Sequence, residues 1–290
     1  MRWRKGSKSG NVEDRRSVGI PGGVAGGIGG LGLILLLLIS VFLGVDPSQI
    51  LQGVPESTGP TGQPSQLSEE QQNQSIEFVS QVLGDTEVTW SKIFKDELGR
   101  TYTDPKLVLF TGAVQSACGR ASASVGPFYC PGDQKIYLDL DFLNDLQGNL
   151  GAPGDFAQAY VIAHEVGHHV QNLVGTMQYA DTMTAEATSE AEANQESVAL
   201  ELQADCYAGV WANRSAQQNL ILESGDLEEG LNAASAVGDD RLQIKSQGYV
   251  VPDSFTHGTS AQRVEWFSRG FESGKMASCD CNCPELPAIG

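Results

Sequence analysis

The sequence predicts an α+β fold that is mainly helical with a small β-sheet, preceded by one transmembrane helix. Three observations support this prediction: an uncharged apolar run near the N-terminus, two short β-branched segments, and long segments with apolar residues at helical spacing. The 290 residues carry 18 Lys and Arg against 36 Asp and Glu, which gives a formal net charge of −18. This length supports one main domain, and the acidic balance argues against nucleic acid as a partner.

The N-terminal part of the chain differs in character from the rest. Six of the 18 basic residues lie within residues 2–16, and residues 17–45 contain no charged residue. We expect a cytoplasmic basic tail at 1–22 and a membrane-spanning helix at 23–45, because about 20 apolar residues span a bilayer and basic flanks stay inside. The protein would then be a single-pass protein of the cell membrane with its main domain extracytoplasmic. A cleaved signal peptide is the alternative, although no small-x-small cleavage site follows the apolar run.

The remainder of the chain divides into a linker and a folded domain. Residues 46–72 are rich in Pro, Gln, Ser and Gly, which predicts a flexible linker. Residues 73–278 are expected to form the domain, with an amphipathic helix that begins near Ser75. Two short strands are expected at Lys106–Phe110 and Lys135–Leu140, because both segments combine β-branched and other apolar side chains.

The segment 154–174 carries the clearest chemical signal. Its apolar residues recur at helical spacing, and Asp155 suits the start of a helix. On this predicted helix His164 and His168 are four residues apart, so both imidazoles project from one face and can bind one cation, with Glu165 beside them. This is the HExxH pattern of zinc hydrolases. A pair of hydrogen-bonded core histidines is the alternative.

A third ligand must lie outside this motif, since hydrolytic Zn²⁺ sites use three protein ligands and leave one position to water. Gln171 and Val174 stand where a metzincin needs glycine and histidine, so that class is excluded. His169 projects from a different side of the helix. The best candidates are Glu201 and Asp205, one turn apart in a mostly apolar predicted helix. Glu201 as ligand and Asp205 as the acceptor that orients an imidazole would explain both carboxylates, and a solvated acidic helix edge is the alternative.

Beyond the metal motif, the chain resembles a family of bacterial neutral zinc metallopeptidases with a single N-terminal anchor. The similarity runs nearly end to end and includes Leu109-Phe-Thr-Gly-Ala-Val-Gln-Ser-Ala-Cys118, Pro127-Phe-Tyr-Cys-Pro131, the HEVGHH helix, Glu201-Leu-Gln-Ala-Asp-Cys206 and Asp253-Ser-Phe-Thr-His-Gly-Thr-Ser-Ala-Gln-Arg263. More distantly, HExxH followed by ExxxD and by Thr256-His257…Arg263 is similar to the pattern of membrane-bound gluzincin proteases. The resemblance implies a zincin-like fold, Zn²⁺ as cofactor and Glu201 as the third ligand.

The motif and the resemblance together predict a zinc metallopeptidase that hydrolyses a peptide or protein substrate. The metal would activate a water molecule, and Glu165 would act as the general base. We expect His257 to stabilise the oxyanion that forms on the scissile carbonyl group. Two alternatives remain open: His257 has a structural role, or Tyr207 or Tyr249 is the donor. Arg263 is expected to fix the C-terminal helix rather than to orient a carboxylate. The alternative function is a non-catalytic envelope-binding module that keeps zinc for stability, although such a module does not require Glu165.

Six cysteines fit an extracytoplasmic location, in which disulfides form. Cys118 and Cys130 close a short loop and are the expected pair. The resemblance suggests in addition that Cys206 pairs with Cys279. The predicted C-terminal tail, residues 279–290, departs from the family pattern. We assign no function to its two further cysteines, Cys281 and Cys283.

Overall fold

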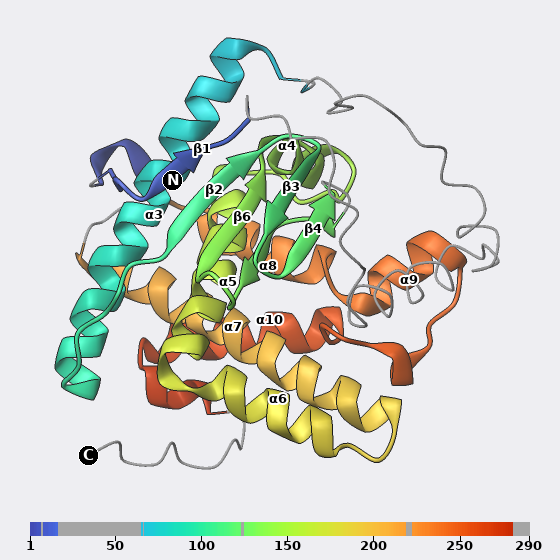
Figure 1. The fold of residues 1–290 in the computed structure, drawn as a ribbon. Helices are drawn as coiled ribbons and strands as arrows, with labels where there is room; N and C mark the ends of the chain where they lie inside the picture. Colours follow the sequence, from blue (N-terminus) through green and yellow to red (C-terminus); the bar gives the residue numbers. More distant parts are fainter. Residues whose placement is uncertain (7, 17–64, 66, 123–124, 219–221, 281–290) are drawn as a thin grey trace.

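The computed structural model describes residues 1–6, 8–16, 65, 67–122, 125–218 and 222–280. Figure 1 shows the strands on one side of the central helix α5 and the helices α6, α7 and α10 on the other. The described elements are, in chain order, η1 Trp3–Lys5, β1 Val12–Asp14, α3 Glu69–Leu98, β2 Lys106–Phe110, β3 Ala113–Ser116, β4 Gly119–Ser122, β5 Phe128–Cys130, β6 Lys135–Asp139, α4 Leu140–Gly148, α5 Asp155–Val174, α6 Thr176–Glu186, α7 Glu190–Gln218, α8 Asp226–Ala236, α9 Asp239–Gln247, η3 Pro252–Ser254, α10 Ser260–Ser273 and η4 Met276–Cys279. The chain is therefore mainly helical with small sheets, as predicted for an α+β protein.

The larger sheet has the strand order β1-β2-β6-β5. Strand β2 runs parallel to both β1 and β6, whereas β5 runs antiparallel to β6. All but the first residue of β2 and of β6 are buried, as is usual for parallel strands that are covered on both faces. Strands β3 and β4 form a separate antiparallel hairpin. The strand predicted at 106–110 is confirmed, and the second predicted strand ends one residue early, at Asp139.

Helix α5 forms the centre of the core. Sixteen of its 20 residues are buried, so it packs against neighbours on nearly every side. The helix starts after Gly154, whose φ is 115°, and it ends at Gly175, whose φ is 93°. Only glycine adopts such values without strain. The buried polar side chains of this helix are consequently held inside a well-packed body.

Helices α5, α7 and α10 approach one another at the level of their main chains. A Cβ atom at Gly167 of α5 would lie 2.9 Å from the carbonyl oxygen of Ala204 in α7. A Cβ atom at Gly270 of α10 would lie 1.9 Å from the carbonyl oxygen of Cys206 in α7. These glycines therefore permit the close crossings that bring side chains of the three helices to one place.

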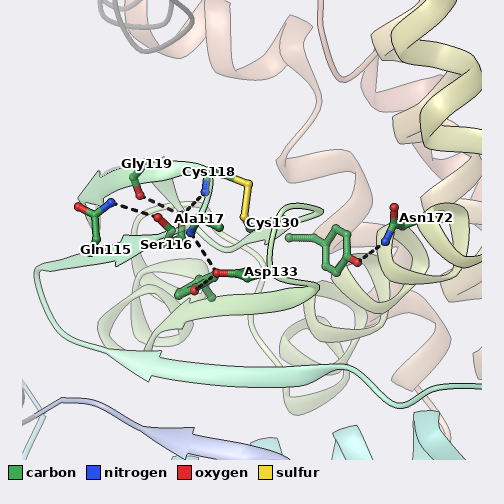
Figure 2. The surroundings of a disulfide bond; sticks show 10 residues. Gln115, Ser116, Ala117, Cys118, Gly119, Cys130, Asp133 and Asn172 are labelled. Carbon is green, nitrogen blue, oxygen red and sulfur yellow. Dashed lines mark hydrogen bonds between the residues drawn. A yellow bond between two sulfur atoms is a disulfide. The ribbon is translucent and has the colours of Figure 1, made fainter. Parts of the chain in front are cut away.

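Two disulfides fasten the edges of this domain. Cys118 and Cys130 join the β3–β4 hairpin to β5, as predicted, and Figure 2 shows this bond among the hydrogen bonds of the hairpin turn. Cys206 and Cys279 join α7 to η4, the pairing that the family resemblance suggested. Because Cys279 belongs to this element, the prediction of a separate tail over 279–290 is wrong at its first residue. Residues 281–290, with the remaining two cysteines, lie outside the described residues.

The basic N-terminal segment belongs to the folded domain, contrary to the prediction of a separate tail at 1–22. Strand β1 pairs with β2 in the larger sheet. The ring of Trp3 lies edge-on to the ring of Phe78, with 5.4 Å between the ring centroids. The α-ammonium group of Met1 lies 2.6 Å from the carboxylate of Asp155 at the start of α5. Basic side chains here bind acidic groups, for example Lys8 and Glu77 at 2.7 Å. The charge pattern that indicated a membrane flank thus serves contacts within the domain.

The predicted single-pass membrane localisation is corrected accordingly. Strand β1, which precedes the segment 17–64, pairs with β2 of the larger sheet. In the part of the chain that the structure describes, no helix is both long and apolar enough to cross a bilayer. The predicted span at 23–45 lies outside the described residues, as does most of the predicted linker at 46–72. The domain begins earlier than residue 73, because α3 starts at Glu69 behind a capping box at Ser68.

Candidate metal centre

Two imidazoles from α5 and one carboxylate from α7 meet between these helices. His164 and His168 are one helical turn apart, and each is 7% exposed. Glu201 lies opposite them, with its carboxylate oxygens 3.1 Å from Nε2 of His164 and 3.3 Å from Nε2 of His168. The three potential ligand atoms lie within 4.8 Å of one another. The structure therefore brings together the three residues that the sequence selected as metal ligands.

The second ring nitrogen of each histidine is hydrogen-bonded to an acceptor. Nδ1 of His164 lies 2.8 Å from the carboxylate of Asp205, and Nδ1 of His168 lies 2.8 Å from Oε1 of Gln171. Each Nδ1 therefore donates, which leaves each Nε2 directed at Glu201. Two imidazole nitrogens and one carboxylate that converge in this way fit a zinc ion.

The charges around this group favour a cation. Burial acts to lower the pKa of His164, but Asp205 and Glu201 raise that pKa to about 10. Burial acts to raise the pKa of Glu201, but His168 and His257 hold it well below its ordinary range. An ionised Glu201 next to two imidazoles attracts protons and metal ions alike, so the two compete for the same nitrogens.

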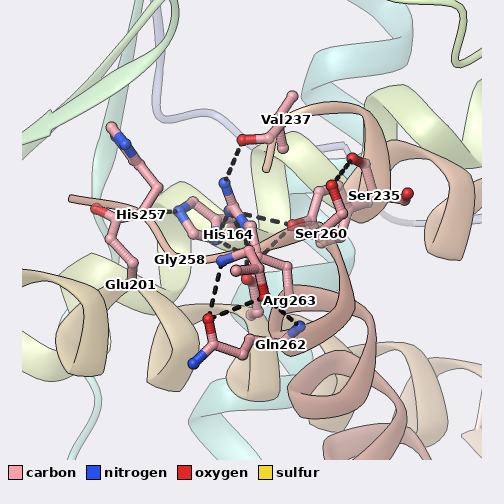
Figure 3. Close-up of polar contacts among 12 residues, drawn as sticks. His164, Glu201, Ser235, Val237, His257, Gly258, Ser260, Gln262 and Arg263 are labelled. Carbon is pink, nitrogen blue, oxygen red and sulfur yellow. Dashed lines mark hydrogen bonds and ion pairs between the residues drawn. The ribbon is translucent and has the colours of Figure 1, made fainter. Parts of the chain in front are cut away.

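Asp205 is fully buried and connects α7 to α10. Its carboxylate accepts hydrogen bonds from His164, from the hydroxyl of Tyr160 and from Arg263, whose Nε and Nη2 lie 2.8 and 3.0 Å from its two oxygens. Figure 3 shows Arg263 beside His164. Burial acts to raise the pKa of Asp205, but Arg263 and His164 lower it. Asp205 thus stays ionised and contacts His164. Arg263 binds this carboxylate and also fixes α10 to α7 and to the carbonyl oxygen of Val237, so both roles considered for it apply.

Glu165 follows His164 on α5 and is 7% exposed. One of its carboxylate oxygens is buried and has no hydrogen-bond partner among the described residues. Burial raises the pKa of Glu165, although the nearby histidines His168 and His164 partly oppose this. A buried acceptor without a partner lowers the stability of the fold, so its presence indicates a role other than folding.

His257 lies in the loop before α10, and its side chain is 50% exposed. Its Nδ1 is 3.2 Å from Oδ1 of Asp239, the first residue of α9. The other oxygen of Asp239 accepts main-chain N–H groups of residues 256–258 at 2.7 to 3.1 Å. Burial acts to lower the pKa of His257, but Glu201 and Asp239 raise it. Figure 3 shows His257 in the same close-up as Glu201 and His164.

The other histidine and tyrosine candidates lie elsewhere. His169 is fully buried, with Nδ1 3.1 Å from the hydroxyl of Tyr129 and Nε2 2.7 Å from the carbonyl oxygen of Thr103, so it ties α5 to β5 and to the segment before β2. Tyr207 packs in the hydrophobic core. Tyr249 follows α9 and is 62% exposed. Of the donors considered from sequence, His257 is the one that shares the close-up of Figure 3 with Glu201 and His164.

Comparison with known proteins decides the family. A family model described as "Putative neutral zinc metallopeptidase" matches residues 1–282. The chain belongs to this family. It is 50% identical over 287 residues to uncharacterized protein YpfJ of Escherichia coli strain K12, which covers 97% of this chain and 98% of that protein. It is 44% identical over 189 residues to an uncharacterized protein of Mycobacterium bovis, which covers 62% of each chain. No solved structure matches the chain.

Membership confirms the resemblance and implies Zn²⁺ as the metal. The family description supports a metallopeptidase, and the printed names of the two relatives describe no activity. The reaction and the role of each residue must therefore be argued from the site itself.

Three residues of this site were missed in the sequence. Gln171 and Tyr160 lie three residues after His168 and four residues before His164, a spacing at which helical side chains meet and which could have indicated both contacts. Asp239 has no comparable signal. It reaches His257 from another element across 18 positions, and no local pattern predicts that contact.

Proposed function

We propose that the chain is a zinc-dependent peptidase with a zincin-like site that hydrolyses peptide bonds. The observation that carries this proposal is the buried carboxylate of Glu165, which lies beside the metal-binding group with one oxygen that has no partner among the described residues. A zinc site that served stability alone would not need this carboxylate. A hydrolase needs a base at this place.

His164, His168 and Glu201 would hold the metal. Two histidines and one glutamate form a ligand set that catalytic zinc sites use, with the fourth position left to water. When bound, zinc would lower the pKa of water to about 7 and polarise a peptide carbonyl group. Asp205, itself held by Arg263, would keep the imidazole of His164 in the orientation that ligation needs.

Glu165 would act as the general base. It would accept a proton from water and pass this proton to the leaving amine. Burial raises the pKa of Glu165 from its ordinary value, which makes this carboxylate a stronger proton acceptor. The oxygen that has no partner among the described residues is the atom available to accept that proton.

His257 would stabilise the negative charge that develops on the scissile carbonyl oxygen. Its Nδ1 is directed at Asp239, so Nε2 remains to donate a hydrogen bond to the substrate. The raised pKa of His257 favours the protonated form that can donate. Asp239 would act as a positioning residue for His257, because it binds both the imidazole and the main chain of the loop.

The substitution Glu165→Gln tests the proposal, since it preserves size but removes the base. We expect the variant to fold and bind zinc like the parent but to hydrolyse a peptide library at least about 10³ times more slowly. Glu186→Gln makes the same chemical change at an exposed position and should leave hydrolysis unchanged. Equal hydrolysis by Glu165→Gln and the parent would refute the mechanism. A fully zinc-loaded parent that cleaves nothing in broad peptide and protein libraries would favour a non-catalytic binding module.

A further inference from the structure

The amide group of Gln171 connects the second histidine of the motif to α7. Gln171 is fully buried and lies three residues after His168 on α5. Its Oε1 is 2.8 Å from Nδ1 of His168. Its Nε2 donates to the carbonyl oxygen of Leu200 at 2.6 Å and to Oε1 of Gln203 at 3.0 Å. The catalytic steps proposed above do not use this side chain.

The carbonyl group of Leu200 determines which way the amide faces. A main-chain carbonyl oxygen can only accept hydrogen bonds, so the amide nitrogen of Gln171 must face Leu200. The amide oxygen must then face His168, and Nδ1 of His168 must donate to it. In a neutral imidazole the remaining lone pair then lies on Nε2. Nε2 is the atom that lies 3.3 Å from Glu201.

The hydrogen bonds of Gln203 also have a fixed donor and acceptor. Gln203 accepts from Gln171 through Oε1 and donates through Nε2 to the carbonyl oxygen of Cys279 at 3.1 Å. Cys279 is fully buried and is held to α7 by its disulfide with Cys206. Two carbonyl groups that cannot reverse their role, those of Leu200 and Cys279, thus orient both amides.

We propose that Gln171 is a positioning residue that holds His168 in the tautomer whose Nε2 can bind the metal. This inference rests on the proposed function, because it assumes that His168 is a zinc ligand. The two histidines would then be held differently: His164 by the ionised Asp205 and His168 by a neutral amide. Groups that orient a ligating imidazole typically contribute a factor of about 10 to 100 to metal affinity.

Two substitutions at residue 171 separate this orienting role from packing. Gln171→Met keeps the length of the side chain but removes the acceptor and both donated bonds. Gln171→Glu loses the same donated bonds but keeps an acceptor for Nδ1. We expect Gln171→Met to raise the dissociation constant for Zn²⁺ about 10- to 100-fold, and Gln171→Glu to recover most of that loss. Competition with a chromogenic chelator measures both constants.

Gln203→Met is the matched control within the same network. It removes the hydrogen bonds of Gln203 to Gln171 and to Cys279 but leaves Gln171 bound to both Leu200 and His168, so the dissociation constant should rise less than about threefold. In the zinc-loaded parent, ¹⁵N-edited NMR should show a slowly exchanging proton on Nδ1 of His168. The same proton should exchange faster in Gln171→Met.

The outcomes distinguish this inference from the proposed function. Equal zinc affinity of Gln171→Met and Gln171→Glu would overturn the orienting role, because a packing role predicts no recovery. Zinc binding by the parent that neither substitution changes would also overturn it and would leave the proposed function intact. A parent that binds no zinc would overturn both.

Discussion

Replacement of Asp205 by asparagine tests how much the buried ion pair contributes to the fold around the site. The substitution preserves the size of the side chain but removes its charge. Four hydrogen bonds from Tyr160, His164 and Arg263 converge on this carboxylate, and an asparagine amide offers one acceptor atom instead of two. Arg263 is 4% exposed, so water cannot readily replace the lost partner. The variant therefore keeps a buried cation whose anion is gone.

The expected loss follows from the burial of both partners. Removal of one member of a buried ion pair usually lowers the free energy of unfolding by about 3–5 kcal/mol. In a domain of this size, each kcal/mol changes the melting temperature by about 2–4 °C. Asp205→Asn should therefore lower the melting temperature by roughly 6 to 20 °C.

Urea unfolding of the metal-free protein, followed by circular dichroism, measures this loss without a contribution from bound metal. Glu265→Gln on α10 is the matched control, because Glu265 pairs with Arg269 at 3.3 Å on the exposed side of the helix. Loss of that pair should lower the free energy of unfolding by no more than about 0.5 kcal/mol.

A double variant completes the test. Asp205→Asn combined with Arg263→Gln removes both charges, so it should be more stable than Asp205→Asn alone. Either of two results would refute the reasoning: a loss below about 1 kcal/mol for Asp205→Asn, or a double variant that is less stable than this single variant.

Three further predictions concern packing, pH and catalysis. Gly270→Ala should lower the melting temperature, because its Cβ would lie 1.9 Å from a carbonyl oxygen of α7. Gly148→Ala should raise the melting temperature, because Gly148 has open space around it. The opposite order in thermal unfolding would contradict the described helix crossing. Burial acts to raise the pKa of Glu13, but hydrogen bonds from Lys135, Arg15 and Lys106 lower this pKa from 4.5 to about 2. Ionised Glu13 should therefore stabilise the fold above pH 4.5 by about 1 kcal/mol or less, and this contribution should disappear as the pH falls toward 2. Urea unfolding of Glu13→Gln across that range should show a flatter pH dependence, and an unchanged profile would disprove the assignment. His257→Ala should retain zinc but lower kcat about 10²-fold or more, and an unchanged kcat would remove it from the mechanism.

The parts of the site that local spacing controls could be predicted from the sequence. His164 and His168 share a helix face by their separation alone. Glu201 and Asp205 could be selected as candidates because two carboxylates lie one turn apart among apolar residues. The strands at 106–110 and near 135–139 were also predictable, because their composition is typical of buried parallel strands.

The contacts between distant elements could not be predicted in the same way. Asp239 reaches His257 only because α9 and the following loop fold back, and periodicity carries no information about that path. Strand β1 has three residues and pairs with a partner more than 90 positions later, so it has no local signature. Its basic neighbours resembled a membrane flank because pattern rules count charges without knowing their partners.

The position of β1 also affects how the protein must be made. Without β1, strand β2 would form the rim of the sheet, and those main-chain N–H and C=O groups of the sequence Lys-Leu-Val-Leu-Phe that face β1 would lose their partners. An exposed apolar strand of this kind is a template for pairing with other chains and for aggregation. β1 emerges from the ribosome long before β2 exists, so the sheet can be closed only after residue 110 has been synthesised. A shortened protein that begins at α3 would contain every proposed zinc ligand and the proposed base, and it should nevertheless be prone to self-association, because its cover strand is missing.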